Sequence, residues 1–109
     1  MSKEQFIMRL SMILTNDDFN RISVHESDDG LELTIDLHYL RCLQAQTILK
    51  NIIALNRFGF SIHAIHGFNH GTAIKEMLTR QSRLNHRFSN IYSPAWNPGE
   101  TYIQIAAIA

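Results

Sequence analysis

A chain of 109 residues, of which 45% are hydrophobic and 18% charged, has the size and composition of one compact globular domain. Its single cysteine, Cys42, excludes an internal disulfide and is typical of a protein in the reducing cytoplasm. No stretch approaches the roughly 18 consecutive apolar residues of a membrane span, so we expect a cytoplasmic protein with no membrane partner.

Residues 1–30 are predicted to form a helix and a strand that extend the main domain. Ser2 and Gln5 have the spacing of a capping box, which favours a helix start at this point. Helical spacing then places a group of apolar side chains on one stripe: Phe6, Ile7, Leu10, Ile13 and Leu14. The pattern breaks at residues 16–19. We expect this helix to pack on the domain's own sheet and cover the face that the other helices leave free; a homodimer contact is the alternative.

Residues 31–109 are predicted to form the main domain, in the order strand, helix, strand, helix, strand, strand. Apolar spacing places these elements at residues 31–38, 41–57, 60–65, 72–83, 86–93 and 101–108. Gly59 is placed to end the first helix, and Asn97-Pro98-Gly99 predicts a turn before the last strand. Strands that alternate with crossover helices pair in parallel, and the last strand is expected to turn back antiparallel. The predicted fold class is therefore α/β, an α+β two-layer sandwich with a mixed four-stranded sheet and two helices on one face.

Titratable side chains stand at the ends of the first two strands of this domain. Asp36 and His38 close the first strand, in the sequence TIDLHYL, and His66 and His70 follow the second, in AIHGFNHG. Because the carboxyl ends of neighbouring parallel strands form one rim where ligands bind, we expect these side chains to meet there. Imidazole titrates near neutral pH, so His38 and His66 are candidate general acid and base, with Asp36 orienting His38.

The segment between His66 and the second helix has the features of an anion-binding turn. Its glycines let the backbone approach a ligand closely, and the free N–H groups at the start of the following helix favour negative charge. This pattern predicts a site for a phosphodiester. The candidate nucleic-acid-binding residues are those of the turn and three basic side chains on the helix: Gly67, Phe68, Asn69, His70, Gly71, Thr72, Lys75, Arg80 and Arg83.

A formal net charge of zero hides an asymmetry along the chain. Residues 1–36 hold three basic and eight acidic side chains, a net charge of −5. Residues 37–99 hold seven basic side chains and one acidic side chain, a net charge of +6. A locally basic surface attracts phosphate even when the total charge is neutral. The alternative interpretation is charge pairing between the two parts of the chain.

Three stretches resemble motifs of the Smr (small MutS-related) domain family, in the same order and spacing. LTIDLHYL resembles the LDLHG motif that opens these domains, IHGFNHGTAIKEML resembles their HGxGxG turn and following helix, and NPGETYIQI resembles their closing turn and strand. The resemblance covers about residues 31–106. The positions that match the first two motifs are Asp36, His38, His66, Gly67 and Gly71. Tyr39 and Asn69 stand where the family has glycines.

The resemblance implies a βαβαββ sandwich like the C-terminal domain of translation initiation factor 3. It also implies nucleic-acid binding and, in several members, endonuclease nicking of DNA or cleavage of RNA. Applied to this chain, it implies an endonuclease that holds the scissile phosphate at the 67–71 turn and transfers protons with His66 and His38 under the influence of Asp36. An RNA substrate supplies its own 2′-hydroxyl nucleophile, whereas DNA requires a water nucleophile, which a metal ion can activate.

Two other functions remain open from the sequence, namely a non-catalytic nucleic-acid-binding module and a protein-interaction module that uses the N-terminal helix. A zinc site from His38, His66 and His70 lacks a second cysteine or a close carboxylate, so we expect no cofactor, and a divalent metal is not indicated. Some aromatic residues could stack on bases, although rings beside turns more often pack over a core edge: Phe68, Tyr92 and Trp96.

Overall fold

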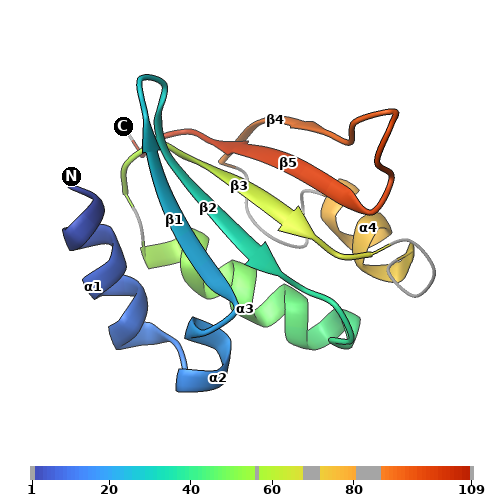
Figure 1. Ribbon diagram of the computed structural model, residues 1–109, viewed down its shortest axis with the longest axis horizontal. Helices are drawn as coiled ribbons and strands as arrows, with labels where there is room; N and C mark the ends of the chain where they lie inside the picture. The colour runs from blue at the N-terminus through green and yellow to red at the C-terminus, as the bar shows by residue number, and fades with distance from the viewer. Residues whose placement is uncertain (1, 56, 68–71, 81–86, 109) are drawn as a thin grey trace.

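The computed structural model describes residues 2–55, 57–67, 72–80 and 87–108. In chain order the elements are α1 (Lys3–Ile13), α2 (Asn16–Phe19), β1 (Ile22–Ser27), β2 (Gly30–Asp36), α3 (Cys42–Leu55), β3 (Phe60–Ile65), α4 (Thr72–Thr79), β4 (Phe88–Tyr92) and β5 (Glu100–Ile105). The strands form one mixed sheet in the order β1-β2-β3-β5-β4 (Figure 1). β2 and β3 pair in parallel, and the other neighbouring strands pair antiparallel. The predicted fold class, an α+β sandwich with a mixed sheet, is confirmed.

The strand of the N-terminal extension joins the sheet and makes it five strands wide. β1 and β2 form a hairpin whose turn residues, Asp28 and Asp29, lead to Gly30 with a φ of 117°. Glycine adopts this left-handed backbone without the clash that a Cβ would cause. Val24 of β1 faces Leu33 of β2 across the pair, and both side chains are buried. The predicted four-stranded sheet is thus extended by one edge strand.

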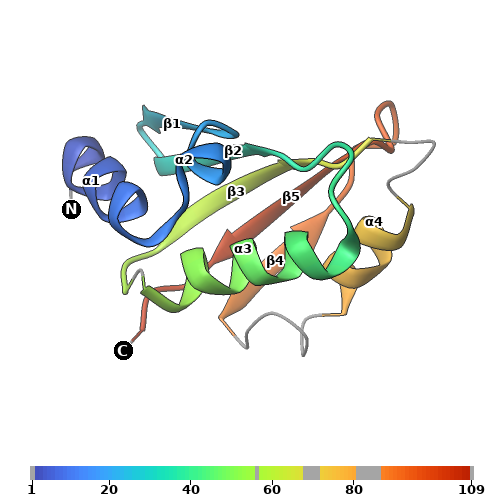
Figure 2. The same cartoon turned by 90° about the horizontal axis from the view of Figure 1, so that it is seen from below.

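The described helices lie on one face of the sheet, as Figure 2 shows from the helix side. Alternation along the strands creates this face, because successive side chains of a strand point to opposite sides. In β3 the buried residues Phe60, Ile62 and Ala64 point toward the helices. α3 buries a stripe at helical spacing: Ala45, Ile48, Leu49, Ile52 and Ile53. Together these side chains belong to one continuous hydrophobic core.

The sequence predicted that α1 covers the free face of the sheet, but in the structure it does not. The predicted capping box is present, since the Ser2 Oγ accepts from the Gln5 N–H and the Gln5 Oε1 accepts from the Ser2 N–H. The helix packs on the same side as α3, where the ring of Phe6 meets those of Phe58 and Phe60 at centroid separations of 5.0 and 5.2 Å. The prediction was wrong because β1 widens the sheet and creates apolar surface on the helix side.

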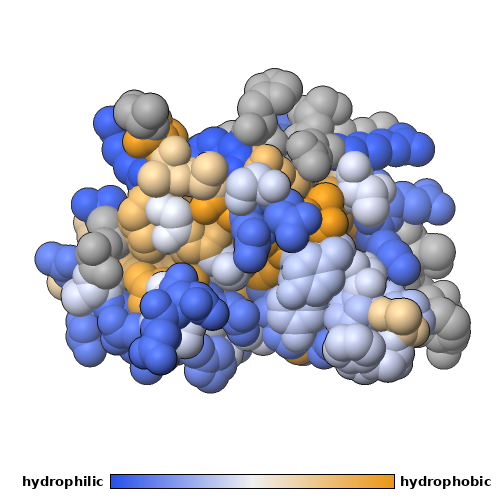
Figure 3. Space-filling view, turned by 90° about the horizontal axis from the view of Figure 1, so that it is seen from above, coloured by the Kyte–Doolittle hydropathy of each residue, from blue (hydrophilic) through white to orange (hydrophobic). Residues whose placement is uncertain are grey.

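The free face of the sheet is polar enough to stand uncovered. Side chains that alternate with the core residues point to it, among them Glu32, Thr34, Ser61, His63 and Gln104. Figure 3 views this face and shows hydrophilic side chains interspersed with hydrophobic areas at its left and centre. The ring of Tyr102 stacks on those of His63 and Tyr92, at centroid separations of 4.3 and 5.3 Å. These rings cover part of the surface that an additional helix would otherwise shield.

Several element boundaries differ from the predicted ones by a few residues, and two of the differences have a clear local cause. Residues 16–19, predicted as a break, form the short helix α2, which the Thr15 side chain caps. α3 ends at Leu55, so Gly59 does not end it. Gly59 instead lies against another strand, because a Cβ at this position would be 3.3 Å from the carbonyl oxygen of Ile105. The glycine thus serves a close approach of two backbones.

Candidate functional site at the carboxyl ends of β2 and β3

The parallel pair of β2 and β3 brings two predicted site segments to one edge of the sheet. Asp36 pairs with Ile65 at the ends of the two strands. Just beyond them, the Leu37 N–H donates to the Ile65 carbonyl oxygen at 2.8 Å. The expectation that these strands are neighbours is confirmed. We call this edge, formed by residues 36–41, 66–67 and 94–99, the rim.

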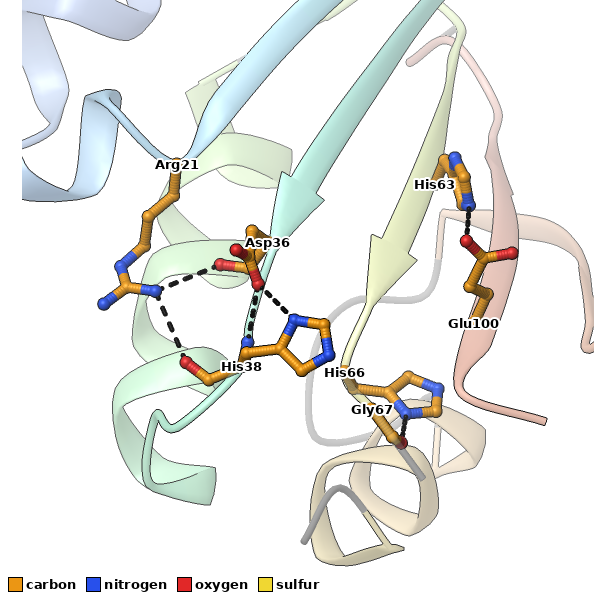
Figure 4. Close-up of polar contacts among 7 residues, drawn as sticks. All are labelled: Arg21, Asp36, His38, His63, His66, Gly67 and Glu100. Carbon is orange, nitrogen blue, oxygen red and sulfur yellow. Dashed lines mark hydrogen bonds and ion pairs between the residues drawn. The ribbon is translucent and has the colours of Figure 1, made fainter. Parts of the chain in front are cut away.

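A carboxylate and an imidazole form a pair at the rim (Figure 4). The Asp36 Oδ1 lies 2.7 Å from the His38 Nδ1 and accepts from the His38 backbone N–H at 2.9 Å. Arg21, just before β1, donates from its Nη1 to the carbonyl oxygens of Asp36 and His38 at 3.3 and 3.4 Å. One guanidinium group therefore holds the backbone of both residues while their side chains contact each other.

The charge of Asp36 decides which nitrogen of His38 carries a hydrogen. Partial burial raises the pKa of Asp36, but hydrogen bonds from the His38 backbone and ring, and the positive charge of Arg21, more than offset this, so the pKa lies below its ordinary value. An ionised carboxylate only accepts, so the His38 Nδ1 donates to it and the Nε2 of the neutral ring keeps its lone pair. With 41% of its side chain exposed, His38 has the chemistry of a general base that a ligand can reach.

The sequence predicted that the backbone of Gly67 binds a phosphate. In the structure, Gly67 instead allows neighbouring segments of the rim to approach closely. Its N–H donates to the Gly99 carbonyl oxygen at 3.0 Å and so is not available to a phosphate. Its φ of 82° lies in the left-handed region, and a Cβ would lie 2.8 Å from the Cδ2 of His38. On the other side, a Cβ on Gly99 would be 3.3 Å from the Gly67 carbonyl carbon. Two glycines thus let three segments of the chain meet.

His66 is buried, and both of its ring nitrogens are bonded inside the protein. The Nδ1 lies 2.8 Å from the Gly67 carbonyl oxygen, and the Nε2 lies 2.8 Å from the Thr101 hydroxyl, which is 3.0 Å from the Ser93 hydroxyl. In the neutral ring, Nδ1 donates to the carbonyl and Nε2 accepts the hydroxyl proton. This arrangement does not favour the predicted proton transfer to a ligand. His66 instead joins the end of β3 to β5 and positions Gly67.

Burial makes the protonation of His66 unfavourable, which predicts a pH-dependent stability. Burial lowers the pKa of His66, with the nearby charges of Lys75 and His38 acting in the same direction against the hydrogen bond to Gly67. The unfolded chain, with an ordinary histidine pKa near 6.5, therefore binds more protons below about pH 6.5 than the folded chain does. We expect the free energy of unfolding to decrease as the pH falls through this range, and to decrease less in His66→Gln.

Urea unfolding of both proteins between about pH 5 and 7.5 measures this effect. The range lies above the one in which Asp36, with its lowered pKa, becomes protonated and loses its own contribution to stability. A wild-type protein whose unfolding midpoint changes with pH as steeply as that of His66→Gln would contradict the prediction.

The described part of the predicted phosphate-binding surface is smaller than the sequence indicated. α4 begins at Thr72, and Lys75 in its first turn is half-buried and near enough to His66 to lower its pKa. α4 ends at Thr79 instead of residue 83, and the exposed Arg80 follows at the far end, roughly 12 Å along the helix axis. Arg80 therefore does not belong to the rim. The predicted residues outside the described ranges are Phe68, Asn69, His70, Gly71 and Arg83.

Sequence reasoning missed two residues of this region. Arg21 bonds to carbonyls 15 and 17 residues further along the chain, and no local spacing indicates such a contact. Tyr39 has a φ of 64° and is 93% exposed. The sequence did hold an indication for Tyr39, because it stands where the similar Smr motif has a glycine. Glycine is the residue that adopts a positive φ most readily.

Other observations bear on what the site can hold. Within residues 2–55, 57–67, 72–80 and 87–108, no three His, Cys, Asp or Glu side chains gather closely enough to hold a metal ion. The helices of these ranges are all too short or too polar to cross a bilayer. Beside the rim, the His63 Nε2 lies 3.3 Å from the Glu100 Oε1 (Figure 4).

The chain matches no family model, no curated protein and no solved structure. Function must therefore be argued from the geometry of the rim.

Proposed function

We propose that the chain is an Smr-like nucleic-acid-binding protein that cleaves RNA at the rim. The observation that carries this proposal is the 2.7 Å contact between the Asp36 Oδ1 and the His38 Nδ1, which leaves the second nitrogen of a half-exposed ring for a substrate. Support also comes from the convergence of the three Smr-like stretches, since Gly67 lies against His38 on one side and against Gly99 on the other.

In the proposed reaction, the His38 Nε2 takes the proton of a ribose 2′-hydroxyl, whose oxygen attacks the adjacent phosphorus. The bond from phosphorus to the 5′-oxygen breaks, and this oxygen takes a proton from solvent water. The His38 imidazolium then gives its proton to the hydroxide that remains, which restores the neutral ring. The products are a 2′,3′-cyclic phosphate and a 5′-hydroxyl. Asp36 holds the Nδ1 hydrogen and stabilises the imidazolium that forms. Lys75 and the N-terminal ends of α3 and α4 contribute positive potential for the phosphate.

RNA fits this site better than DNA because, among the described residues, the rim offers a ligand one imidazole that can take a proton. The bonded nitrogens of His66 leave His38 as the proton acceptor, and RNA needs no separate nucleophile since its 2′-hydroxyl supplies one. DNA lacks this group and requires an activated water. The same observation favours a second candidate, a module that binds nucleic acid without cutting it, because one half of the predicted acid–base pair is committed to the fold. A homodimer contact through α1 stays a prediction.

Incubation with labelled single-stranded RNA and DNA of one sequence, with and without EDTA, tests the proposal. We expect RNA to be cut with or without the chelator, the products to carry cyclic phosphate ends by mass spectrometry, and DNA to stay intact. His38→Ala protein purified in the same way is the control for a contaminating nuclease. Salt-sensitive binding without cleavage would overturn the nuclease and support the binding module, whereas binding to neither strand would overturn both.

A further inference from the structure

Tyr39 holds a strained backbone conformation at the rim, and its side chain packs little against the protein. Among the described residues it is the one non-glycine residue with a positive φ, and a residue with a Cβ adopts this left-handed conformation at a cost. Its side chain is 93% exposed, so burial does not offset the strain. A glycine would satisfy the backbone better. The tyrosine ring is therefore best explained by a contact outside the chain.

Trp96 occupies the other side of the rim and is also exposed, to 86%. It lies in the turn between β4 and β5, close in the chain to Gly99. Gly99 lies against Gly67, and Gly67 lies against the ring of His38, which Tyr39 follows directly. Three segments of the rim thus lie side by side, and the Gly67 segment is the middle one. Tyr39 and Trp96 belong to the two outer segments.

We propose that Tyr39 and Trp96 stack on unpaired bases of a single-stranded polynucleotide that crosses the rim. This inference rests on the proposed function and specifies its substrate as single-stranded. Exposed aromatic rings bind bases by stacking, whereas the bases of a duplex are already stacked on one another. The ring centroids of Tyr39 and His38 are 6.0 Å apart. A base stacked on Tyr39 therefore brings its own ribose and phosphate beside the His38 ring.

The distribution of charge supports a polyanion at the rim. Arg41 is exposed at the start of α3, and Lys75 lies in the first turn of α4. The acidic turn of Asp28 and Asp29 lies at the opposite end of β2, roughly 20 Å from the rim for a strand of this length. Asp36 and Glu100 also lie near this edge, but each pairs with a histidine ring, so the surface around the two aromatic rings is mixed where the opposite end of the sheet is acidic.

The aromatic rings on the free face of the sheet match a nucleic acid less well. Tyr102 and Tyr92 stack on each other there, beside the carboxylates of Glu100 and Glu32. Burial raises the pKa of Tyr102 most, and the charges of Glu100 and Glu32 raise it further, so both carboxylates act on this ring. Asp29 and Glu32 line the same hollow as Tyr92 and Tyr102, and these carboxylates disfavour a phosphate backbone there. Tyr39 and Trp96 are therefore the better stacking pair.

Trp96 is the single tryptophan of the chain, so its fluorescence reports stacking directly. The protein would be titrated with three ligands: a short single-stranded DNA, its duplex, and an abasic strand that keeps the phosphates but lacks the bases. DNA has no 2′-hydroxyl and therefore stays intact. A 2′-O-methyl RNA strand shows whether RNA and DNA are bound alike. We expect the strands with unpaired bases to quench the fluorescence, and the abasic strand to bind without quenching it.

Fluorescence anisotropy of a labelled strand measures affinity without relying on Trp96. Tyr39→Gly, which suits the positive φ, and Trp96→Ala are each expected to weaken single-strand binding by roughly 5- to 150-fold, while abasic binding stays unchanged. Tyr39→Phe keeps the ring and should keep the affinity. Met8→Ala removes an apolar side chain that is 60% exposed on α1 and serves as the matched control.

The outcomes separate this inference from the proposed function. Single-strand affinity that is unchanged in both Tyr39→Gly and Trp96→Ala overturns stacking, as does quenching by the abasic strand equal to that by the ordinary strand. Either result leaves the proposed function in place, because the proposed cleavage requires phosphate binding, His38 and Asp36 but neither aromatic ring. Wild-type protein that binds none of the strands overturns both.

Discussion

Replacing His38 with alanine is expected to slow RNA cleavage by a factor of roughly 100 to 10,000, the usual contribution of a positioned general acid or base. The loss should be near the full value, because His66, the neighbouring imidazole, has both nitrogens bonded inside the protein and cannot substitute. Single-turnover rates with the protein in excess measure the chemical step apart from product release. Affinity for single-stranded DNA should change little, since alanine leaves Lys75 and the helix ends in place.

Two further variants separate chemistry from folding. Asp36→Asn keeps the size of the side chain but loses the charged oxygen that holds the His38 Nδ1 hydrogen, so it should also cut more slowly. His25→Ala removes an exposed imidazole from β1 and should cut at the wild-type rate. Thermal unfolding confirms that each variant is folded. RNA cleavage at an undiminished rate by folded His38→Ala protein would remove His38 from the mechanism.

Replacing Arg87 with methionine is expected to lower the free energy of unfolding by about 3 kcal/mol. Its guanidinium donates to the carbonyl oxygens of Ile53, of Phe58 at 3.2 Å and of Ala106 at 3.0 Å. It therefore joins the last turns of α3 to the segments before β3 and after β5. Burial lowers the pKa of Arg87 below its ordinary value, but an arginine keeps its charge near neutral pH. Methionine leaves these carbonyls without their charged donor.

Arg87→Lys and Arg9→Met complete this experiment. A lysine keeps the charge but lacks the planar fork of donors, so we expect it to recover part of the lost stability. Arg9 is exposed on α1, and its replacement should change the free energy of unfolding by less than about 0.5 kcal/mol. Urea unfolding followed by circular dichroism measures all three. A change for Arg87→Met as small as that for Arg9→Met would show that the three hydrogen bonds contribute little.

Arg87 also shows why the charge count overstated the basic surface. Arg87 is one of the seven basic residues within residues 37–99 whose charge was expected to attract phosphate. In the folded protein its guanidinium bonds to backbone carbonyls and stabilises the fold. Charge along a sequence therefore bounds the potential of a surface without saying which side chains reach it.

Local patterns in the sequence determined the elements and the fold class of this protein. Alternating apolar residues specified β2 and β3, and helical spacing specified α3, because each pattern depends on residues that are close together in the chain. The capping box of Ser2 and Gln5 specified the start of α1 for the same reason. Strands joined by a crossover helix pair in parallel, so the sequence also predicted that Asp36 and the segment after β3 share one edge.

The roles of the rim side chains were decided by tertiary structure alone. A hydrogen bond to Thr101, 35 residues away, makes His66 part of the fold, and a contact with Gly99 turns the Gly67 N–H away from a ligand. The side of the sheet that α1 covers likewise followed from the extra width of β1. Such contacts depend on the register and packing of distant segments. Because burial and competing partners set whether a polar group stays available, no local periodicity encodes them.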